Sequence, residues 1–320
     1  MAKKLNKKVV VILLVIAGIC ALGTAGAGAY LLKSRNPEYC LKRAQEALEE
    51  NDYKAAERYF GRACAVAKTN REKIENYFRL AEFHLIQNDY HEADWSKALG
   101  CWNQILRIDP KNEPATRKMF DYFYEVADLG QSQAWKQVQN YSGDLLKILE
   151  ETQQPTDIKI LLAHGRACLE IARLGTTSDR LELLKEAAAD FQRYLELNPS
   201  DVKGYEYLAE CMLVRGSIEA SQGNLQSQQI ARQESEKILQ QAIERSDNLP
   251  AAWAAKINFE LETLTDPNRL EEIRQEAENL IQTLPASDLL YTALSNAYER
   301  SGRRSRVEEL TKAVEAMRQA

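Results

Sequence analysis

The chain has 320 residues, 45% of them hydrophobic, and a formal net charge of −5 at pH 7. Six of its 42 Lys and Arg residues fall within the first 35 positions, so the remainder carries 36 basic against 47 acidic residues, a net charge of about −11. A nucleic-acid-binding protein normally carries a basic patch. The acidic body therefore excludes that class of function.

The first 36 residues differ from the rest of the chain. Residues 1–8 contain four lysines and are predicted to form a basic cytoplasmic tail. Residues 9–32 are uncharged and would span roughly 36 Å as a helix, enough to cross a hydrocarbon core of about 30 Å. We expect a transmembrane signal-anchor helix there, followed by a short linker at residues 33–36.

The alternative is a cleaved signal peptide, with small residues before a cleavage site after Ala29. Both interpretations place the body on the extracytoplasmic side, periplasmic in a bacterium, either membrane-anchored as a single-pass protein or as a secreted soluble form. Four alanines spaced four residues apart form a small-residue stripe through which the span could self-associate: Ala17, Ala21, Ala25 and Ala29.

The body, residues 37–320, is rich in Ala, Leu, Glu, Gln, Arg and Lys, which favour helices. Prolines fall between amphipathic stretches, where helices end. We predict an all-α fold of about seven helical hairpins, an α-solenoid. The predicted pairs are 37–50 with 53–68, 71–87 with 91–108, 112–129 with 132–151, 155–174 with 178–197, 201–221 with 226–246, 250–264 with 268–283, and 286–300 with 303–318.

The tripeptide Asn-Asp-Tyr occurs twice, at residues 51–53 and 88–90. Asn and Asp suit a tight turn and can cap the following helix. We therefore expect each copy to lie between the two helices of a hairpin, with the tyrosine beginning the second helix and packing in the seam.

The small and large residues of these hairpins resemble the tetratricopeptide repeat (TPR) family, a 34-residue helix-turn-helix ending in proline. The first hairpin carries the pattern in Ala44, Ala47, Tyr53, Ala56, Phe60 and Ala63, and the fourth in Ala187, Phe191, Asn198 and Pro199. The resemblance covers roughly residues 37–318. Five extra residues, "HEADW", predict that the second helix of hairpin two is lengthened or begins late.

No motif of enzymatic chemistry is present in the body, and neither a cofactor site nor a metal site is predicted. His84 and His91 match no ligand spacing and are expected to lie in a solvated turn, and His164 is expected to be a packed or groove-lining residue. The scattered cysteines are expected to act as small buried hydrophobic residues.

The resemblance implies that the first helices of the hairpins line a concave binding groove. Counted in the family's frame, the predicted groove residues of the first three hairpins are Leu41, Gln45, Phe78, Glu82, Arg117, Asp121 and Tyr124. Their aromatic and charged types suit a bound peptide or helix, although the aromatic ones could simply pack against a neighbouring helix. The basic clamp that some family members use for chaperone C-termini is absent.

The sequence therefore favours a non-enzymatic protein–protein interaction scaffold, similar to anchored TPR proteins of the bacterial envelope that assist secretion or envelope assembly. Two alternatives stay open. The chain could be a regulatory or substrate-docking subunit, or the N-terminal part, of an enzyme system. It could also be an array that binds glycans or small ligands through its four tryptophans.

Overall fold

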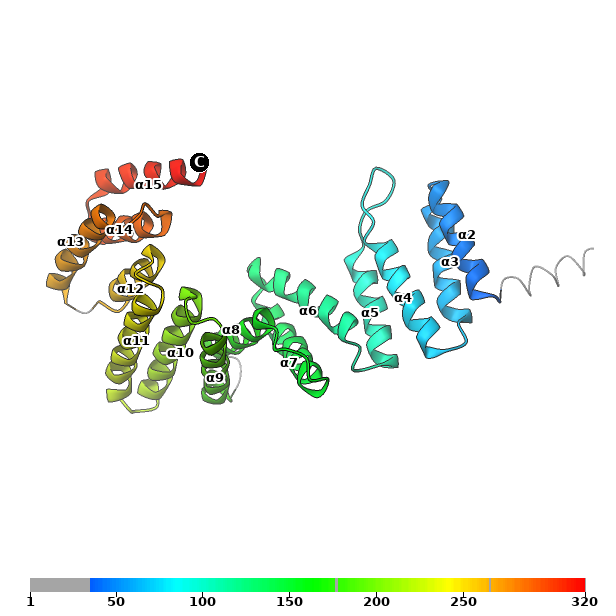
Figure 1. Cartoon of the computed structure of the whole chain (residues 1–320), viewed down its shortest axis with the longest axis horizontal. Helices are drawn as coiled ribbons and strands as arrows, with labels where there is room; N and C mark the ends of the chain where they lie inside the picture. The colour runs from blue at the N-terminus through cyan, green and yellow to red at the C-terminus, as the bar shows by residue number, and fades with distance from the viewer. Residues whose placement is uncertain (1–34, 176–177, 265, 320) are drawn as a thin grey trace, which may run out of the picture. The chain divides into compact units, whose positions relative to one another are not determined.

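The computed structural model describes residues 35–175, 178–264 and 266–319, and these residues form fourteen α-helices and one 3₁₀ turn (Figure 1). The helices are α2 (Pro37–Glu49), α3 (Tyr53–Val66), α4 (Asn70–His84), α5 (Trp95–Ile108), α6 (Glu113–Asp128), α7 (Trp135–Glu151), α8 (Ile158–Leu174), α9 (Arg180–Leu197), α10 (Val202–Ser221), α11 (Gln226–Arg245), α12 (Pro250–Glu262), α13 (Pro267–Thr283), α14 (Asp288–Arg300) and α15 (Arg304–Gln319), and the 3₁₀ turn is Ser132–Ala134. The prediction of an all-helical body is confirmed.

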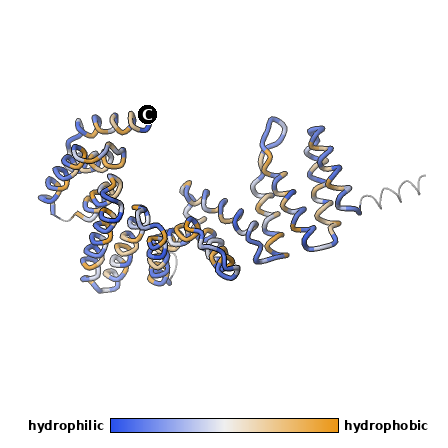
Figure 2. Tube along the Cα trace, in the orientation of Figure 1, coloured by the Kyte–Doolittle hydropathy of each residue, from blue (hydrophilic) through white to orange (hydrophobic). Residues whose placement is uncertain are grey.

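The seven predicted hairpins correspond to successive pairs from α2 with α3 to α14 with α15, and most helix ends agree within three residues. We call the first helix of each pair the A helix and the second the B helix. Hydrophobic residues recur along each helix instead of gathering in one segment (Figure 2). This is the pattern of helices that bury one stripe against their neighbours.

The predicted transmembrane segment, residues 9–32, lies outside the described residues, as do the basic tail and the first half of the linker, residues 33–34. Within the described part of the chain, no helix has the length and apolar character needed to cross a membrane. The anchor therefore stays a prediction.

The chain divides into two compact units, the first ending at Met119 and the second beginning at Phe120, within α6. In the first unit, α2 packs on α3, α3 on α4 and α4 on α5. Ala44 and Ala56 are fully buried there, and the rings of Phe60 and Phe83 lie 5.5 Å apart. Alanine lets the helices approach closely while the aromatic rings fill the space that remains.

In the second unit each B helix from α7 to α13 contacts its own A helix or the next one, and the successive A helices α8, α10, α12 and α14 contact one another. Phe191 of α9 is fully buried beside Gly165 of α8, where an added Cβ would lie 2.8 Å from the phenyl ring. The small residue is required because the helices approach so closely. Because each of the A helices α8, α10, α12 and α14 contacts the next one, these four helices form one contiguous layer of this unit.

The described cysteines are buried and free, as expected: Cys40, Cys64, Cys101, Cys168 and Cys211.

The first Asn-Asp-Tyr tripeptide behaves as predicted. Asn51 adopts a positive φ of 58°, and the Asp52 carboxylate accepts a hydrogen bond of 2.9 Å from the Ala55 amide at the start of α3. Tyr53 then packs its ring 6.4 Å from that of Phe83.

The second tripeptide lies between α4 and α5 as predicted, but the expectation that its tyrosine begins the second helix and packs in the seam was wrong. Tyr90 lies in a loop with 71% of its surface exposed, and α5 begins five residues later at Trp95. The extra residues let Asp94 cap the helix, since its side chain accepts a hydrogen bond from the Lys97 amide. Of the two alternatives for this helix, the late start is the one observed. Asn88 instead donates a 2.6 Å hydrogen bond to the Tyr53 hydroxyl, so the two tripeptides meet in space.

Candidate partner-binding surface and B-helix pocket

The second unit carries a row of aromatic and charged side chains along three successive A helices. We define this A-helix surface by seven residues: Tyr124 and Asp128 of α6, Arg166 and Arg173 of α8, and Glu206, Tyr207 and Glu210 of α10. Spacings of three or four residues place side chains on one face of a helix. Arg166 and Arg173 are two turns apart, and Glu206 and Glu210 are one turn apart.

Arg166 lies at the centre of this surface. Its guanidinium carbon is 4.7 Å from the ring centre of Trp135, 5.8 Å from that of Tyr207 and 5.9 Å from that of Tyr124, all within cation–π range. Nη1 donates a 2.7 Å hydrogen bond to Asp128. Burial opposes the charge, but the hydrogen bonds to Asp128 and Tyr124 outweigh it and raise the pKa of Arg166.

The Nε atom of Arg166 is buried and has no hydrogen-bond partner within the residues described. An unsatisfied buried donor costs about 1–3 kcal/mol. The Arg166 side chain is therefore held in place by the three aromatic rings around it and by Asp128. Its Nε donor has no hydrogen-bond acceptor among the described residues.

Two carboxylates on α10 extend the surface. Glu210 forms a 2.6 Å ion pair with Arg173 of α8. Glu206 has no ion pair or hydrogen bond with any described residue, although it is only partly exposed. Burial raises the pKa of both carboxyl groups, and it also raises the pKa of Tyr207 to about 12. Glu206 is thus a part-buried acid that forms no ion pair in the described chain, although the charge of Lys203 on the same helix partly offsets the effect of burial on its pKa.

The predicted groove residues of the first unit fall on its A helices, with Leu41 and Phe78 half-buried and Gln45 and Glu82 exposed. Leu41 lines a groove of about 720 Å³ between α2 and α4, together with Glu75, Asn76 and Arg79. Gln45, Phe78 and Glu82 do not line this groove.

Arg117 is half-buried and donates a 3.0 Å hydrogen bond to Glu113 on its own helix. Asp121, in the second unit, is exposed and lies 3.8 Å from the Lys159 ammonium group. Tyr124 is half-buried beside Arg166. Of the predicted residues, Tyr124 is therefore the one that belongs to the A-helix surface.

The four clustered aromatics of α6 are not all buried. Phe120 is 1% exposed, whereas Tyr122, Phe123 and Tyr124 are partly exposed, as expected for one helix that cannot bury all of them on one stripe. Phe123 stacks on Tyr141 of α7 at 5.8 Å.

Sequence reasoning missed the residues of the A-helix surface on α8 and α10. A signal was present, because Gln45 follows Ala44 and Glu82 follows Ala81 in the first two A helices. The same small-then-polar step recurs as Gly165-Arg166 and as Ala209-Glu210. Extending the count to these helices would have found Arg166 and Glu210.

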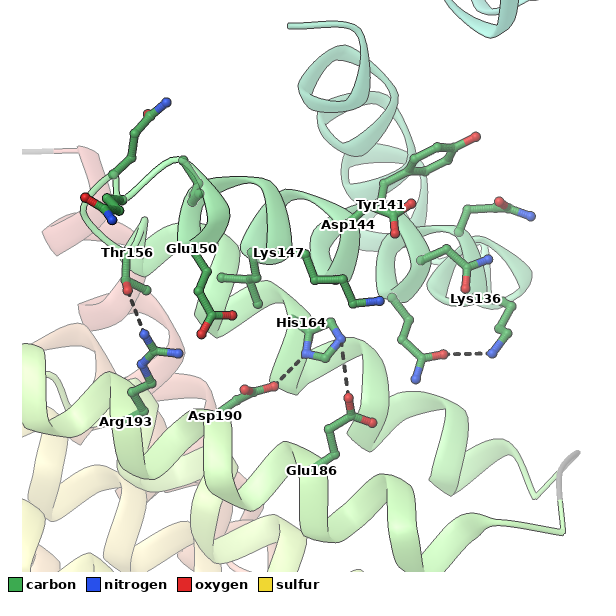
Figure 3. Close-up of a pocket in the computed structure, with 18 residues that line it drawn as sticks. Lys136, Tyr141, Asp144, Lys147, Glu150, Thr156, His164, Glu186, Asp190 and Arg193 are labelled. Carbon is green, nitrogen blue, oxygen red and sulfur yellow. Dashed lines mark hydrogen bonds and ion pairs between the residues drawn. The ribbon is translucent and has the colours of Figure 1, made fainter. Parts of the chain in front are cut away.

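A second concavity lies between the B helices α7 and α9 and has a volume of about 940 Å³ (Figure 3). We call it the B-helix pocket. His164 of α8 lies at its base, between Asp190 at 2.6 Å from Nδ1 and Glu186 at 3.8 Å from Nε2. At its rim Arg193 donates a 2.8 Å hydrogen bond to the Thr156 hydroxyl.

His164 lies as expected, whereas the expected solvated turn was wrong for His84, because its ring is buried beside that of Phe83. His84 is 4% exposed, and burial lowers its pKa. The ring of His91 packs 5.1 Å from that of Phe83, and its Nδ1 is 2.8 Å from the Ile86 carbonyl oxygen. His164 is 7% exposed and lines the B-helix pocket, so it is both packed and groove-lining.

No protein-family model matches the sequence, and a search of curated proteins finds no match either. Among solved structures, a tetratricopeptide repeat protein from Parabacteroides merdae is 15% identical, with a TM-score of 0.47 over 88% of this chain and 93% of that one. The C-terminal part of a TPR-containing protein from Cytophaga hutchinsonii is 14% identical, with a TM-score of 0.47 over 87% of this chain and 94% of that one.

A third similar structure is PilW, described as a type IV pilus biogenesis factor. It is 16% identical, with a TM-score of 0.40 over 81% of this chain and 98% of that one. At these low sequence identities and TM-scores, the similar structures carry no argument about function. The function proposed below is based on the geometry of the A-helix surface.

Proposed function

We propose that the chain is a non-enzymatic scaffold that binds a partner protein through the A-helix surface of its second unit. The observation that carries the proposal is the continuous row of aromatic and part-buried charged groups across α6, α8 and α10. Interfaces are enriched in Tyr, Trp and Arg because these side chains combine apolar area with hydrogen-bonding capacity.

The state of Glu206 indicates the chemistry of the partner. A part-buried carboxylate without a partner costs free energy, and a Lys or Arg of a bound segment would remove that cost. Tyr207 beside it offers a ring for the apolar stem of the same side chain. The proposed partner segment is a peptide or helix that presents a basic residue to Glu206.

We further propose that residues 9–32 anchor this scaffold in a membrane, with the body on the extracytoplasmic side. The length of the uncharged segment and the lysines before it support this orientation. Mass spectrometry of the mature N-terminus tests it: an intact N-terminus supports the anchor, whereas a chain beginning at Tyr30 shows that the segment is a cleaved signal.

The binding proposal is tested by crosslinking in cells followed by affinity purification of the full-length chain. The Glu206→Lys variant is compared with the wild type and with Glu196→Lys, which makes the same charge change at an exposed position of the B helix α9. We expect a partner that the wild type and Glu196→Lys both recover and that Glu206→Lys loses. Recovery by all three would refute the A-helix surface as the binding site.

A further inference from the structure

Three metal-ligating side chains meet at the base of the B-helix pocket. His164 and Cys168 are one turn apart on α8. Glu186 projects from α9 towards His164 (Figure 3). Their ligand atoms all lie within 4.8 Å of one another. His164 is 7% exposed and Cys168 is fully buried, whereas the Glu186 side chain is 49% exposed at the pocket.

The histidine is held in the orientation that a metal ligand needs. Asp190 accepts a 2.6 Å hydrogen bond from Nδ1 of His164, which leaves the lone pair on Nε2 directed to the side of Glu186. Metal-binding histidines nearly always donate their other ring N–H to such a carboxylate or to a carbonyl group. Asp190 is therefore placed as the positioning residue of the cluster.

Helix α7 leaves the free ring nitrogen accessible and contacts the thiol. Gly143 stands in the interior of this helix, where a Cβ would lie 3.3 Å from Nε2 of His164. Glycine costs about 1 kcal/mol relative to alanine at such a position. One turn earlier, Gln139 donates a 3.5 Å hydrogen bond to the Cys168 sulfur.

We propose that His164, Cys168 and Glu186 bind a divalent transition-metal ion of the Zn²⁺ type. A thiolate and an imidazole together select borderline-soft ions such as Zn²⁺ and Co²⁺ over Mg²⁺ and Ca²⁺. Three protein ligands leave one position of a tetrahedral ion for water from the pocket.

The geometry needs only a small closure. Ligand bonds of about 2.0–2.3 Å place the ligand atoms about 3.5 Å apart around a tetrahedral Zn²⁺. The exposed Glu186 side chain is free to close the remaining gap of about 1 Å. A cysteine binds such an ion as the thiolate, so binding would replace the proton of the Cys168 thiol with the ion and release that proton to solvent, with no change of oxidation state.

Titration of the purified full-length chain with Co²⁺ tests the proposal, because a cobalt–thiolate bond gives a near-ultraviolet charge-transfer band. We expect one equivalent of Co²⁺ to produce the band and Zn²⁺ to remove it. The band should disappear in Cys168→Ser and persist in Cys211→Ser, which changes an equally buried cysteine of α10. Absence of the band in the wild type, or its persistence in Cys168→Ser, would overturn the proposal.

Glu186→Gln provides a test that leaves the core intact, since this residue is exposed. It should weaken Co²⁺ binding about tenfold or more, whereas Glu182→Gln, one turn away on the same helix, should leave it unchanged. Asp190→Asn should weaken binding by about 10- to 100-fold through loss of the positioning carboxylate. Equal affinities in Glu186→Gln and Glu182→Gln would show that the carboxylate is not a ligand.

Discussion

Replacing Gly216 by alanine tests how closely α10 and α11 approach within the fifth hairpin. An added Cβ would lie 2.8 Å from the Ser227 carbonyl oxygen and would collide with the Cβ of Ala231. A backbone atom and a methyl group cannot rotate away, so the two helices would have to separate. Such overpacking costs about 1–3 kcal/mol.

Helix propensity acts in the opposite direction, because alanine is favoured over glycine by about 0.8–1 kcal/mol in a helix interior. The collision should outweigh this gain, so Gly216→Ala should lower the local stability of the hairpin by up to about 2 kcal/mol. Gly100→Ala is the matched control. Gly100 is exposed within α5, and an added Cβ there meets no atom within 4 Å, so we expect stabilisation by up to about 1 kcal/mol.

A stack of helical hairpins can unfold locally, one or a few helices at a time. The assay is therefore native-state hydrogen exchange measured by mass spectrometry, which reports the stability of each peptide separately. Gly216→Ala should accelerate exchange in α10 and α11 and leave α5 unchanged. Gly100→Ala should slow exchange in α5. Unchanged or slower exchange of α10 and α11 in Gly216→Ala would refute the close approach of these helices.

Three further predictions concern packing, capping and pH. Phe191→Ala empties a fully buried site in α9 and should destabilise the second unit by about 3–5 kcal/mol, seen as faster exchange in α8 and α9; a loss below about 1 kcal/mol would contradict the assigned core. Thr69→Ala removes the capping box that Thr69 forms with Glu72 at the start of α4, and it should lower the stability of this helix by about 0.5–2 kcal/mol. Hydrogen exchange of the first turn of α4 measures the loss, and Thr311→Ala, at an exposed site of α15, is the control. Because burial raises the pKa of Glu206 above its ordinary value of 4.5, the folded chain holds this proton more tightly than the unfolded chain. The free energy of unfolding should therefore fall as pH rises from 4.5 through the raised pKa of Glu206. Glu206→Gln should be more stable than the wild type at pH 7 but not at pH 4. Equal stability of the variant and the wild type at both pH values would show that burial of Glu206 does not make stability depend on pH.

The helices could be predicted because their signals are local. Asn36, Thr69, Asp157 and Asp201 cap the helices that follow them, and Pro250 begins α12. The starts of these five helices are thus specified by residues within one turn of them.

Tyr90 shows where a local pattern fails. Its tripeptide is identical to the one that begins α3, yet the residues between it and Trp95 let Asp94 supply the cap. The start of α5 depended on a choice between two capping residues, and the sequence motif alone did not decide it.

The two clusters proposed to be functional depend on contacts between helices. His164 and Cys168 share a face of α8, which the sequence shows, but their acidic neighbours Glu186 and Asp190 come from α9, after an intervening loop. Arg166 likewise takes its ring contacts from three other helices. Such arrangements follow from packing, and spacing along the chain does not specify them.

The central claim, that α6, α8 and α10 together present a partner-binding surface, is tested most directly by binding measured with purified components. The partner recovered by crosslinking would be titrated into the full-length wild type, Glu206→Lys and Glu196→Lys. We predict that the Kd of Glu206→Lys rises at least about tenfold, equivalent to about 1.4 kcal/mol, while Glu196→Lys binds as the wild type does. Equal Kd values for all three proteins would contradict the account.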